Sequence, residues 1–134
     1  MIEIYTDGAY SSSRDQGGWA FVVLKDGVKV SSGYDGVKNT TNNRMEIQSA
    51  IEAIKHMKQQ NILEFTIFSD SMYLIGTMTK NWKKNKNVDL WIEIFDLVEG
   101  LNITWKHVKG HAGNKYNDHC DMLAVHGSQL IIND

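Results

Sequence analysis

Two aspartates stand where predicted β-strands end. Asp7 is expected to end a strand that begins at Ile2, and Asp70 follows an apolar-rich strand at 63–68. If the two strands are parallel, both carboxylates emerge at one edge of the sheet, where open α/β folds place their sites. The carboxylates would repel each other unless a divalent cation such as Mg²⁺ or Mn²⁺ lay between them. Position alone equally permits turn or helix-cap roles, because Asp7 precedes a glycine and Asp70 precedes a predicted helix.

Three further acids are candidate ligands for the same ion. Glu46 could close a capping box whose cap is Asn43, or it could lean from the apolar stripe of its helix toward the sheet edge. Asp118 and Asp121 stand one turn apart on the last predicted helix, and each could add a carboxylate. Helical periodicity does not choose among these alternatives.

The histidines offer two other kinds of chemistry. His111 lies in a glycine-rich segment, and an imidazole with an unperturbed pKa of about 6.5 can exchange protons at neutral pH. A surface histidine without function is the alternative. A zinc site formed by His107, His111, His119 and Cys120 is possible by residue type, but the chain has one thiol, and several acids at one sheet edge favour a harder ion.

The elements that position these residues follow from periodicity. Short β-branched and aromatic runs at 2–5, 19–25 and 28–32, with a hairpin signal at Asp26-Gly27, predict three successive strands. Apolar residues at helical spacing after Asn43 predict an amphipathic helix, so the next strand is expected to pair in parallel with an earlier one. Helices at 71–80, at 88–99 and from about 114, and a strand at 101–108, complete the prediction. Glycine, asparagine, aspartate and serine cluster at 7–18, 26–27, 31–43, 110–114 and 127–128, and predict the turns.

Composition limits the class of protein. The 134 residues are 42% hydrophobic and 22% charged, which predicts one folded domain spanning 1–134. The sequence has neither an apolar run of membrane-spanning length nor a secretory signal, and a single cysteine is typical of a reducing compartment, so we expect a cytoplasmic protein. The net charge of −2 gives no indication of nucleic-acid binding, and the lysines at 80–86 are as typical of a solvated helix end as of a phosphate-binding surface.

Four segments of the sequence read YTDG at 5–8, TTNNRME at 40–46, FSDS at 68–71 and VKGHAG at 108–113, and Asn117 and Cys120-Asp121 follow the last of them. In their order and spacing, from residue 1 to about 126, these segments strongly resemble the type 1 ribonuclease H family of bacteria and eukaryotes. Each segment alone would be weak evidence, because short motifs recur by chance.

The resemblance implies an α/β ribonuclease H-like fold: a five-stranded mixed sheet, with three antiparallel strands and then two parallel ones, and helices on both faces. It implies a catalytic site in which Asp7, Glu46, Asp70 and Asp121 hold two Mg²⁺ ions, with Mn²⁺ as a substitute. Asp118 matches an auxiliary acidic position of the metal site. The matching GHAG segment gives His111 a role in proton transfer or product release.

The same resemblance suggests nucleic-acid contacts. Asn42 and Asn43 match residues that contact the hybrid, Thr41 and Asn87 match a pocket for a DNA phosphate, and Trp82 matches an aromatic residue of the DNA-binding channel. Helix capping for the asparagines and core packing for the tryptophan are the alternatives.

Three departures from the family pattern concern binding of the hybrid. Ser13 stands where many relatives carry an asparagine that touches RNA, and Met72 replaces a glutamine that often reads the minor groove, although a thioether accepts hydrogen bonds poorly. The stretch 82–87 is too short for the basic protrusion of many bacterial relatives, which leaves Lys83, Lys84 and Lys86 as its remnant. We therefore expect weak, salt-sensitive binding.

The predicted function is metal-dependent endonucleolytic hydrolysis of the RNA strand of RNA–DNA hybrids, leaving 5′-phosphate and 3′-hydroxyl ends. We expect a monomer with no obligate protein partner and no membrane association. The alternative is a non-catalytic nucleic-acid-binding module on the same fold. Clustered carboxylates argue against that alternative, because they repel phosphate and a binding module does not need them.

Overall fold

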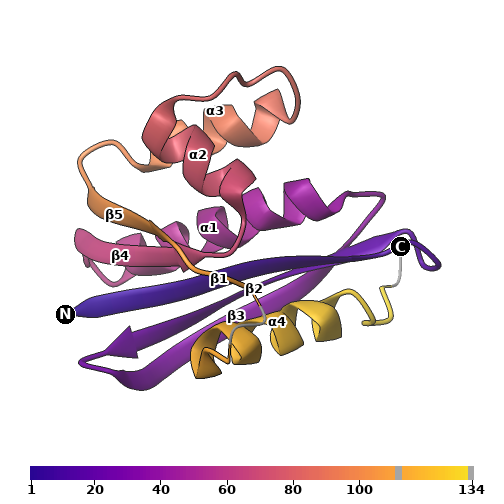
Figure 1. The fold of residues 1–134 in the computed structure, drawn as a ribbon, viewed down its shortest axis with the longest axis horizontal. Helices are drawn as coiled ribbons and strands as arrows, with labels where there is room; N and C mark the ends of the chain where they lie inside the picture. Colours follow the sequence, from indigo (N-terminus) through magenta and orange to yellow (C-terminus); the bar gives the residue numbers. More distant parts are fainter. Residues whose placement is uncertain (111–112, 133–134) are drawn as a thin grey trace.

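The elements follow one another along the chain with short connections. A computed structural model describes residues 1–110 and 113–132. The strands and helices are β1 (Ile2–Ser11), β2 (Gln16–Lys25), β3 (Val28–Lys38), α1 (Asn42–Gln59), β4 (Glu64–Ser69), α2 (Met72–Lys80), α3 (Val88–Leu97), β5 (Asn102–His107) and α4 (Lys115–Gly127). The strands form one sheet in the order β3-β2-β1-β4-β5, antiparallel from β3 to β1 and parallel from β1 to β5 (Figure 1). The predicted five-stranded mixed sheet is confirmed.

The antiparallel strands are longer than predicted. β1 and β2 pair without interruption from Ile2 with Lys25 to Ser11 with Gln16, so the turn predicted over 7–18 is confined to 12–15. β3 continues to Lys38, so the turn predicted over 31–43 is also too long. The prediction that Asp7 ends the first strand is wrong, because Asp7 pairs with Ala20 inside the ladder. The Asp26-Gly27 hairpin is confirmed, and both residues have the positive φ of a tight hairpin turn.

These strands contain glycines at the positions where helices approach the sheet closely. A Cβ atom at Gly8 would lie 2.5 Å from the backbone nitrogen of Glu46 in α1. On the other face, a Cβ atom at Gly18 would overlap the carbonyl oxygen of Ala124 in α4. The glycines that resemble turn signals in the sequence therefore serve close packing of helix against strand.

The parallel half of the sheet begins with a short contact. β1 pairs with β4 over three residues only, Glu3–Tyr5 opposite Thr66–Phe68. In contrast, β4 pairs with β5 along its whole length. β1 therefore continues beyond its last parallel pair, and the two strands separate just before Asp7. This separation opens the carboxyl edge of the parallel half.

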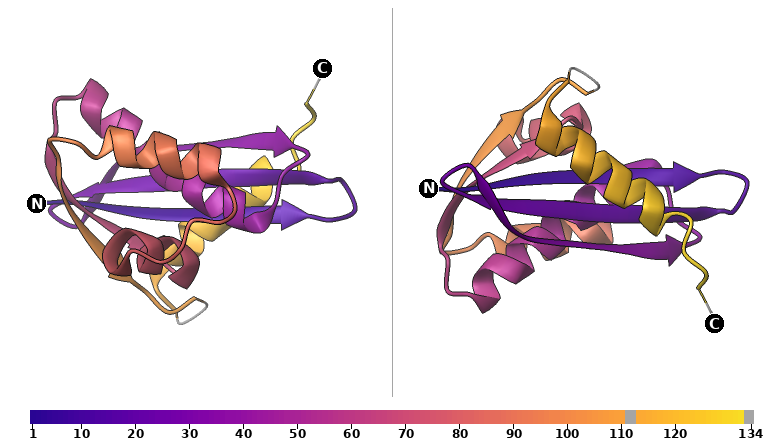
Figure 2. Two further views of the ribbon diagram at one scale, coloured as in Figure 1. Left: turned by 90° about the horizontal axis from the view of Figure 1, so that it is seen from above. Right: turned by 90° about the horizontal axis from the view of Figure 1, so that it is seen from below.

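Helices cover both faces of the sheet. α1, α2 and α3 lie on one face and α4 lies across the other (Figures 1 and 2). The core on the first face includes Ile4, Phe21 and Trp91, and the core on the second includes Val22 and Ala124. Burial on both faces explains why the middle of β2 is apolar without alternation. None of the described helices has the length and apolar content to cross a membrane.

Candidate active site

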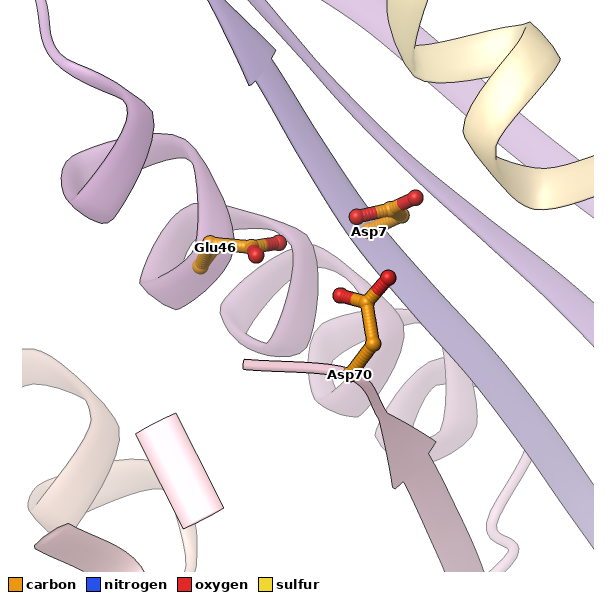
Figure 3. A group of neighbouring side chains, drawn as sticks. All are labelled: Asp7, Glu46 and Asp70. Carbon is orange, nitrogen blue, oxygen red and sulfur yellow. The ribbon is translucent and has the colours of Figure 1, made fainter. Parts of the chain in front are cut away.

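Three carboxylates from distant parts of the sequence meet at the opened edge. Asp7 comes from β1, Glu46 from α1, and Asp70 from the residue after β4; one oxygen of each lies within 4.8 Å of the others. Figure 3 shows the three side chains directed toward one another. The exposed fractions of Asp7 and Glu46 are only 3% and 5%. Like charges so close and so poorly solvated require a cation or protons to be stable.

Backbone packing sets the positions of these acids. Asp7 lies two residues past Tyr5, the last residue of β1 that pairs with β4, and Asp70 directly follows the end of β4. The missing side chain of Gly8 lets the first turns of α1 approach β1, so Glu46 lies beside Asp7. The chain after β5 also passes close by, since a Cβ atom at Gly110 would lie 2.9 Å from Oδ2 of Asp70.

Electrostatics in this cluster favours bound protons when no cation is present. Burial, followed by the charges of Asp70 and Asp121, raises the pKa of Asp7 to about 8. Burial and the charges of Asp7 and Asp70 raise the pKa of Glu46 well above its usual value. The Gly8 N–H donates to Asp7 Oδ1 at 2.9 Å, but Asp7 Oδ2 and Glu46 Oε1 have no hydrogen-bond partner among the described residues. Carboxylate oxygens without a hydrogen-bond partner in a close, buried acidic group fit a hard divalent cation.

Helix caps near the cluster come from other residues. The N-cap of α1 is Thr41, whose Oγ1 accepts from the Arg44 N–H at 3.1 Å, so the capping box with Asn43 as cap is wrong. The N-cap of α2 is Ser71, whose Oγ accepts from the Leu74 N–H at 3.1 Å. Glu46 and Asp70 are therefore not capping residues, and the alternatives that explained them as caps are removed.

The two acids of α4 occupy different surroundings. Asp121 is half-buried, and its charge contributes to the raised pKa of Asp7, so it lies near the cluster. Asp118 is exposed and lines a cavity of about 520 Å³ together with Lys29 and His119. Among the described residues the close group contains Asp7, Glu46 and Asp70 alone. Metal binding by Asp121 and Asp118 stays a prediction.

The histidine predictions meet separate outcomes. His111 lies outside the described residues. Of the zinc alternative, His107 contacts the Asp70 carbonyl oxygen at 3.3 Å, and His119 Nε2 lies 2.9 Å from Lys29 Nζ. Cys120 is fully buried, and its Sγ donates to the carbonyl oxygens of Tyr5 and Ala20. These described members do not form a ligand group.

Thr41 and Asn87, the pair predicted to hold a DNA phosphate, are linked through Arg44. Arg44 Nη1 donates to Asn87 Oδ1 at 3.3 Å, while the Arg44 N–H is capped by Thr41. Asn87 occupies the N-cap position of α3, but its side chain makes no capping hydrogen bond. The amide Nδ2 instead donates to the Tyr73 hydroxyl at 3.0 Å. Arg44 stands inside a recognised motif, but Tyr73 carried no sequence signal that connected it with this pair.

The other predicted nucleic-acid contacts lie on separate elements. Trp82 is 41% exposed, and its ring packs on Gly76, so core packing does not fully account for it. Met72 is 39% exposed in the first turn of α2, and Ser13 lies in the distant turn between β1 and β2. Lys84 donates to Asn81 Oδ1 at 2.6 Å.

Lys83 is exposed, like Asn42 and Asn43 at the start of α1. Their contacts with nucleic acid stay predictions.

Comparison with known proteins agrees with this geometry. The RNase H family model matches residues 1–129. Ribonuclease H of Caldanaerobacter subterraneus subsp. tengcongensis is 41% identical, with 93% of this chain and 89% of the relative covered. RNase H1 of Halobacterium salinarum has a TM-score of 0.80 at 24% identity, covering 94% of this chain and 96% of the other. LC11-RNase H1, solved in complex with an RNA/DNA hybrid, has a TM-score of 0.83 at 19% identity, covering 96% of each chain.

The two structural likenesses support the fold, and the family follows from the family model and the sequence identity. Both extend over nearly the whole chain, including the segments that supply Asp7, Glu46 and Asp70. The chain therefore belongs to the type 1 ribonuclease H family of nucleases.

Proposed function

We propose that this protein hydrolyses the RNA strand of RNA–DNA hybrids internally and leaves 5′-phosphate and 3′-hydroxyl ends. The observation that carries the proposal is the group of Asp7, Glu46 and Asp70, whose oxygens lie within 4.8 Å of one another in a buried position. Membership of the ribonuclease H family supports the reaction, and the complex of LC11-RNase H1 with an RNA/DNA hybrid supports the substrate class.

The residues present fit a divalent cation, and we propose that the site binds two, Mg²⁺ or Mn²⁺. Asp7, Glu46 and Asp70 would hold them, with Asp121 as the fourth ligand and Asp118 as an auxiliary acid. When bound, such ions lower the pKa of the attacking water and stabilise the departing 3′ oxygen. The fit rests on the unpartnered oxygens of Asp7 and Glu46, which a cation would satisfy.

The protein groups have separable tasks in this proposal. Burial excludes bulk water from Asp7 and Glu46, and the Gly8 N–H fixes the orientation of the Asp7 carboxylate. His111 would transfer a proton or assist product release. Asn42 and Asn43 would contact the hybrid from its wide minor groove, where 2′-hydroxyl groups distinguish RNA from DNA. Thr41 and Asn87 would hold a phosphate of the DNA strand, beside Trp82 of the DNA-binding channel.

The test compares three labelled duplexes of one sequence: the hybrid, double-stranded RNA and double-stranded DNA. Each is incubated with Mg²⁺ and, separately, with a chelator. We expect internal cleavage of the RNA in the hybrid with Mg²⁺ alone, and products that a 5′-phosphate-dependent exonuclease degrades. Equal cleavage in chelator would overturn the metal requirement, and equal cleavage of all three duplexes would overturn the substrate.

The same assay distinguishes the alternative of a non-catalytic binding module. Such a module would retain the hybrid in a filter-binding assay and leave it intact with Mg²⁺. The buried, like-charged carboxylates argue against a binding module, because they repel the phosphates of the hybrid and would serve no purpose without catalysis. We further propose that the protein acts as a cytoplasmic monomer, which sedimentation of the purified chain would test for the oligomeric state.

A further inference from the structure

The Tyr73 hydroxyl accepts hydrogen bonds from two side chains, one in α3 and one at its N-cap. Trp91 Nε1 donates to it at 3.2 Å, and Asn87 Nδ2 donates to it at 3.0 Å. Trp91 is 1% exposed, so its indole N–H, which can only donate, depends on this acceptor. The Trp91 bond therefore holds the Tyr73 oxygen in place as an acceptor for Asn87.

The oxygen of the Asn87 amide also has a defined partner. Its Oδ1 accepts from Arg44 Nη1 at 3.3 Å, and the guanidinium is held by Asp89 through bonds of 3.0 Å and 2.7 Å. A flipped amide would place its NH₂ group against the guanidinium, donor against donor. Arg44 and Tyr73 together therefore determine which way the amide of Asn87 points.

This orientation leaves one group of Asn87 unused. The NH₂ group has two hydrogens, and Tyr73 receives one of them. The second N–H has no partner among the described residues. A phosphate oxygen can only accept hydrogen bonds, so the remaining N–H is the part of Asn87 that a phosphate would use.

Tyr73 also connects this amide with the carboxylate cluster. It stands in the first turn of α2, three residues after Asp70, and its ring packs edge-on against Trp91 of α3 at 5.4 Å between centroids. A phosphate held by Asn87 is thereby kept at a fixed offset from Asp70.

We propose that Tyr73 is a positioning residue for the substrate: its hydroxyl holds the Asn87 amide so that one N–H is presented to a phosphate of the bound hybrid. The inference rests on the proposed function and adds a residue that does not itself touch the substrate. Because a net hydrogen bond is modest, we expect loss of the hydroxyl to weaken hybrid binding by about 3- to 10-fold.

The experiment measures the Kd of a fluorescent hybrid by anisotropy with Mg²⁺ in an Asp70→Asn background, where cleavage is expected to be too slow to interfere. We expect Tyr73→Phe to raise the Kd by about 3- to 10-fold, and Asn87→Ala to raise it at least as much. The double variant should bind no more weakly than Asn87→Ala alone, because Tyr73 acts through Asn87.

Thr77→Val is the matched control for stability. Thr77 Oγ1 donates to the Tyr73 carbonyl oxygen at 2.7 Å, so the substitution disturbs the same helix and leaves the phenol in place. We expect a lower melting temperature, as in Tyr73→Phe, with an unchanged Kd. A Tyr73→Phe Kd within twofold of its parent, or additive losses in the double variant, would overturn the inference.

Cleavage by the chain with Asp70 intact tests the proposed function separately. If that chain binds the hybrid and does not cleave it, the proposed function fails, and the Kd values still decide the role of Tyr73. If it binds no hybrid at all, both proposals fail.

Discussion

Two polar clusters near the ends of α1, α2 and α3 are built on opposite principles. In the first, Asp7, Glu46 and Asp70 bring like charges together out of water, and the pKa of Asp7 rises to about 8. In the second, Arg44 and Asp89 pair opposite charges near the surface, and the pKa of Asp89 falls to about 2, chiefly because Arg44 hydrogen-bonds to it. The charges of the first cluster need bound protons or a cation to balance them, whereas the charges of the second cluster balance each other. The difference separates a site that takes up a ligand from a network that holds side chains in place.

The largest expected effect is the loss of catalysis when a carboxylate of the first cluster is replaced. Asp70→Asn removes a charge from the first cluster while preserving its shape. We expect the single-turnover cleavage rate of a hybrid in Mg²⁺ to fall by several orders of magnitude, and we expect the metal-free protein to be no less stable, because the native cluster is electrostatically costly. Asp89→Asn is the control, with cleavage at saturating hybrid close to that of wild type. A clear loss of stability in metal-free Asp70→Asn would assign Asp70 a structural role instead.

The two clusters should also respond to pH with opposite signs. The pKa of Asp7 rises from an ordinary 3.8 to about 8 on folding, so between these values the folded protein binds a proton that the unfolded chain releases. This contribution to stability is complete below pH 3.8 and disappears as the pH rises through 8. We therefore expect the free energy of unfolding in chelator to decrease from pH 5 to pH 8, by a few kcal/mol at most.

Asp7→Asn should flatten this dependence, because the amide does not titrate. Urea denaturation with chelator at both pH values measures it, and added Mg²⁺ at pH 8 should stabilise wild type more than the variant. If Asp7→Asn is less stable than wild type at pH 8 in chelator, the cluster is not the source of the pH dependence.

A smaller effect separates proton transfer from charge. His111→Ala is expected to slow turnover by about 10² at neutral pH, the low end for a lost general acid or base. Metal binding should be unchanged, since the carboxylates remain. Turnover as a function of Mg²⁺ concentration measures both quantities, and an unchanged maximal rate would show that His111 has no role in turnover.

The smallest effect belongs to the second cluster. The Asp89 side chain is 66% exposed, so Asp89→Asn should lower the free energy of unfolding by at most about 1 kcal/mol at neutral pH. The contribution of Asp89 is present above pH 3.8 and is lost as the pH falls toward 2, opposite to that of Asp7. Denaturation at low and high salt measures the pair, whose effect should shrink as salt screens it. A loss of several kcal/mol in the free energy of unfolding would show that the pair of Arg44 and Asp89 is a major source of stability.

The sequence allowed most elements to be predicted, because their signals are local. The Asp26-Gly27 hairpin and the position of Asp70 after β4 follow from turn residues and apolar runs a few positions away. The placement of Asp7 was wrong for a tertiary reason: Gly8 and Gly18 resemble turn residues until the helices that pack against them are known.

The site could be predicted only in part, for similar reasons. Two threonines are followed by two asparagines at 40–43, where α1 begins, and local sequence does not identify Thr41 among them as the N-cap. The bonds from Arg44 to Asn87 and Asp89 join residues more than forty positions apart, so no periodicity reveals them. Tyr73 looks like an ordinary aromatic residue of a short helix until its two donors are seen.

The reaction rate of the buried thiol beneath α4 reports on opening of that helix. Cys120 is the one cysteine of the chain, and it is fully covered where α4 meets β1 and β2. A thiol reagent can reach it only while α4 is lifted from the sheet, and burial further raises the pKa of the thiol and suppresses its reactivity. The rate of modification under native conditions therefore counts how often α4 opens. Asp121 lies on the same helix, so the modification rate also reports how often Asp121 moves away from Asp7, Glu46 and Asp70.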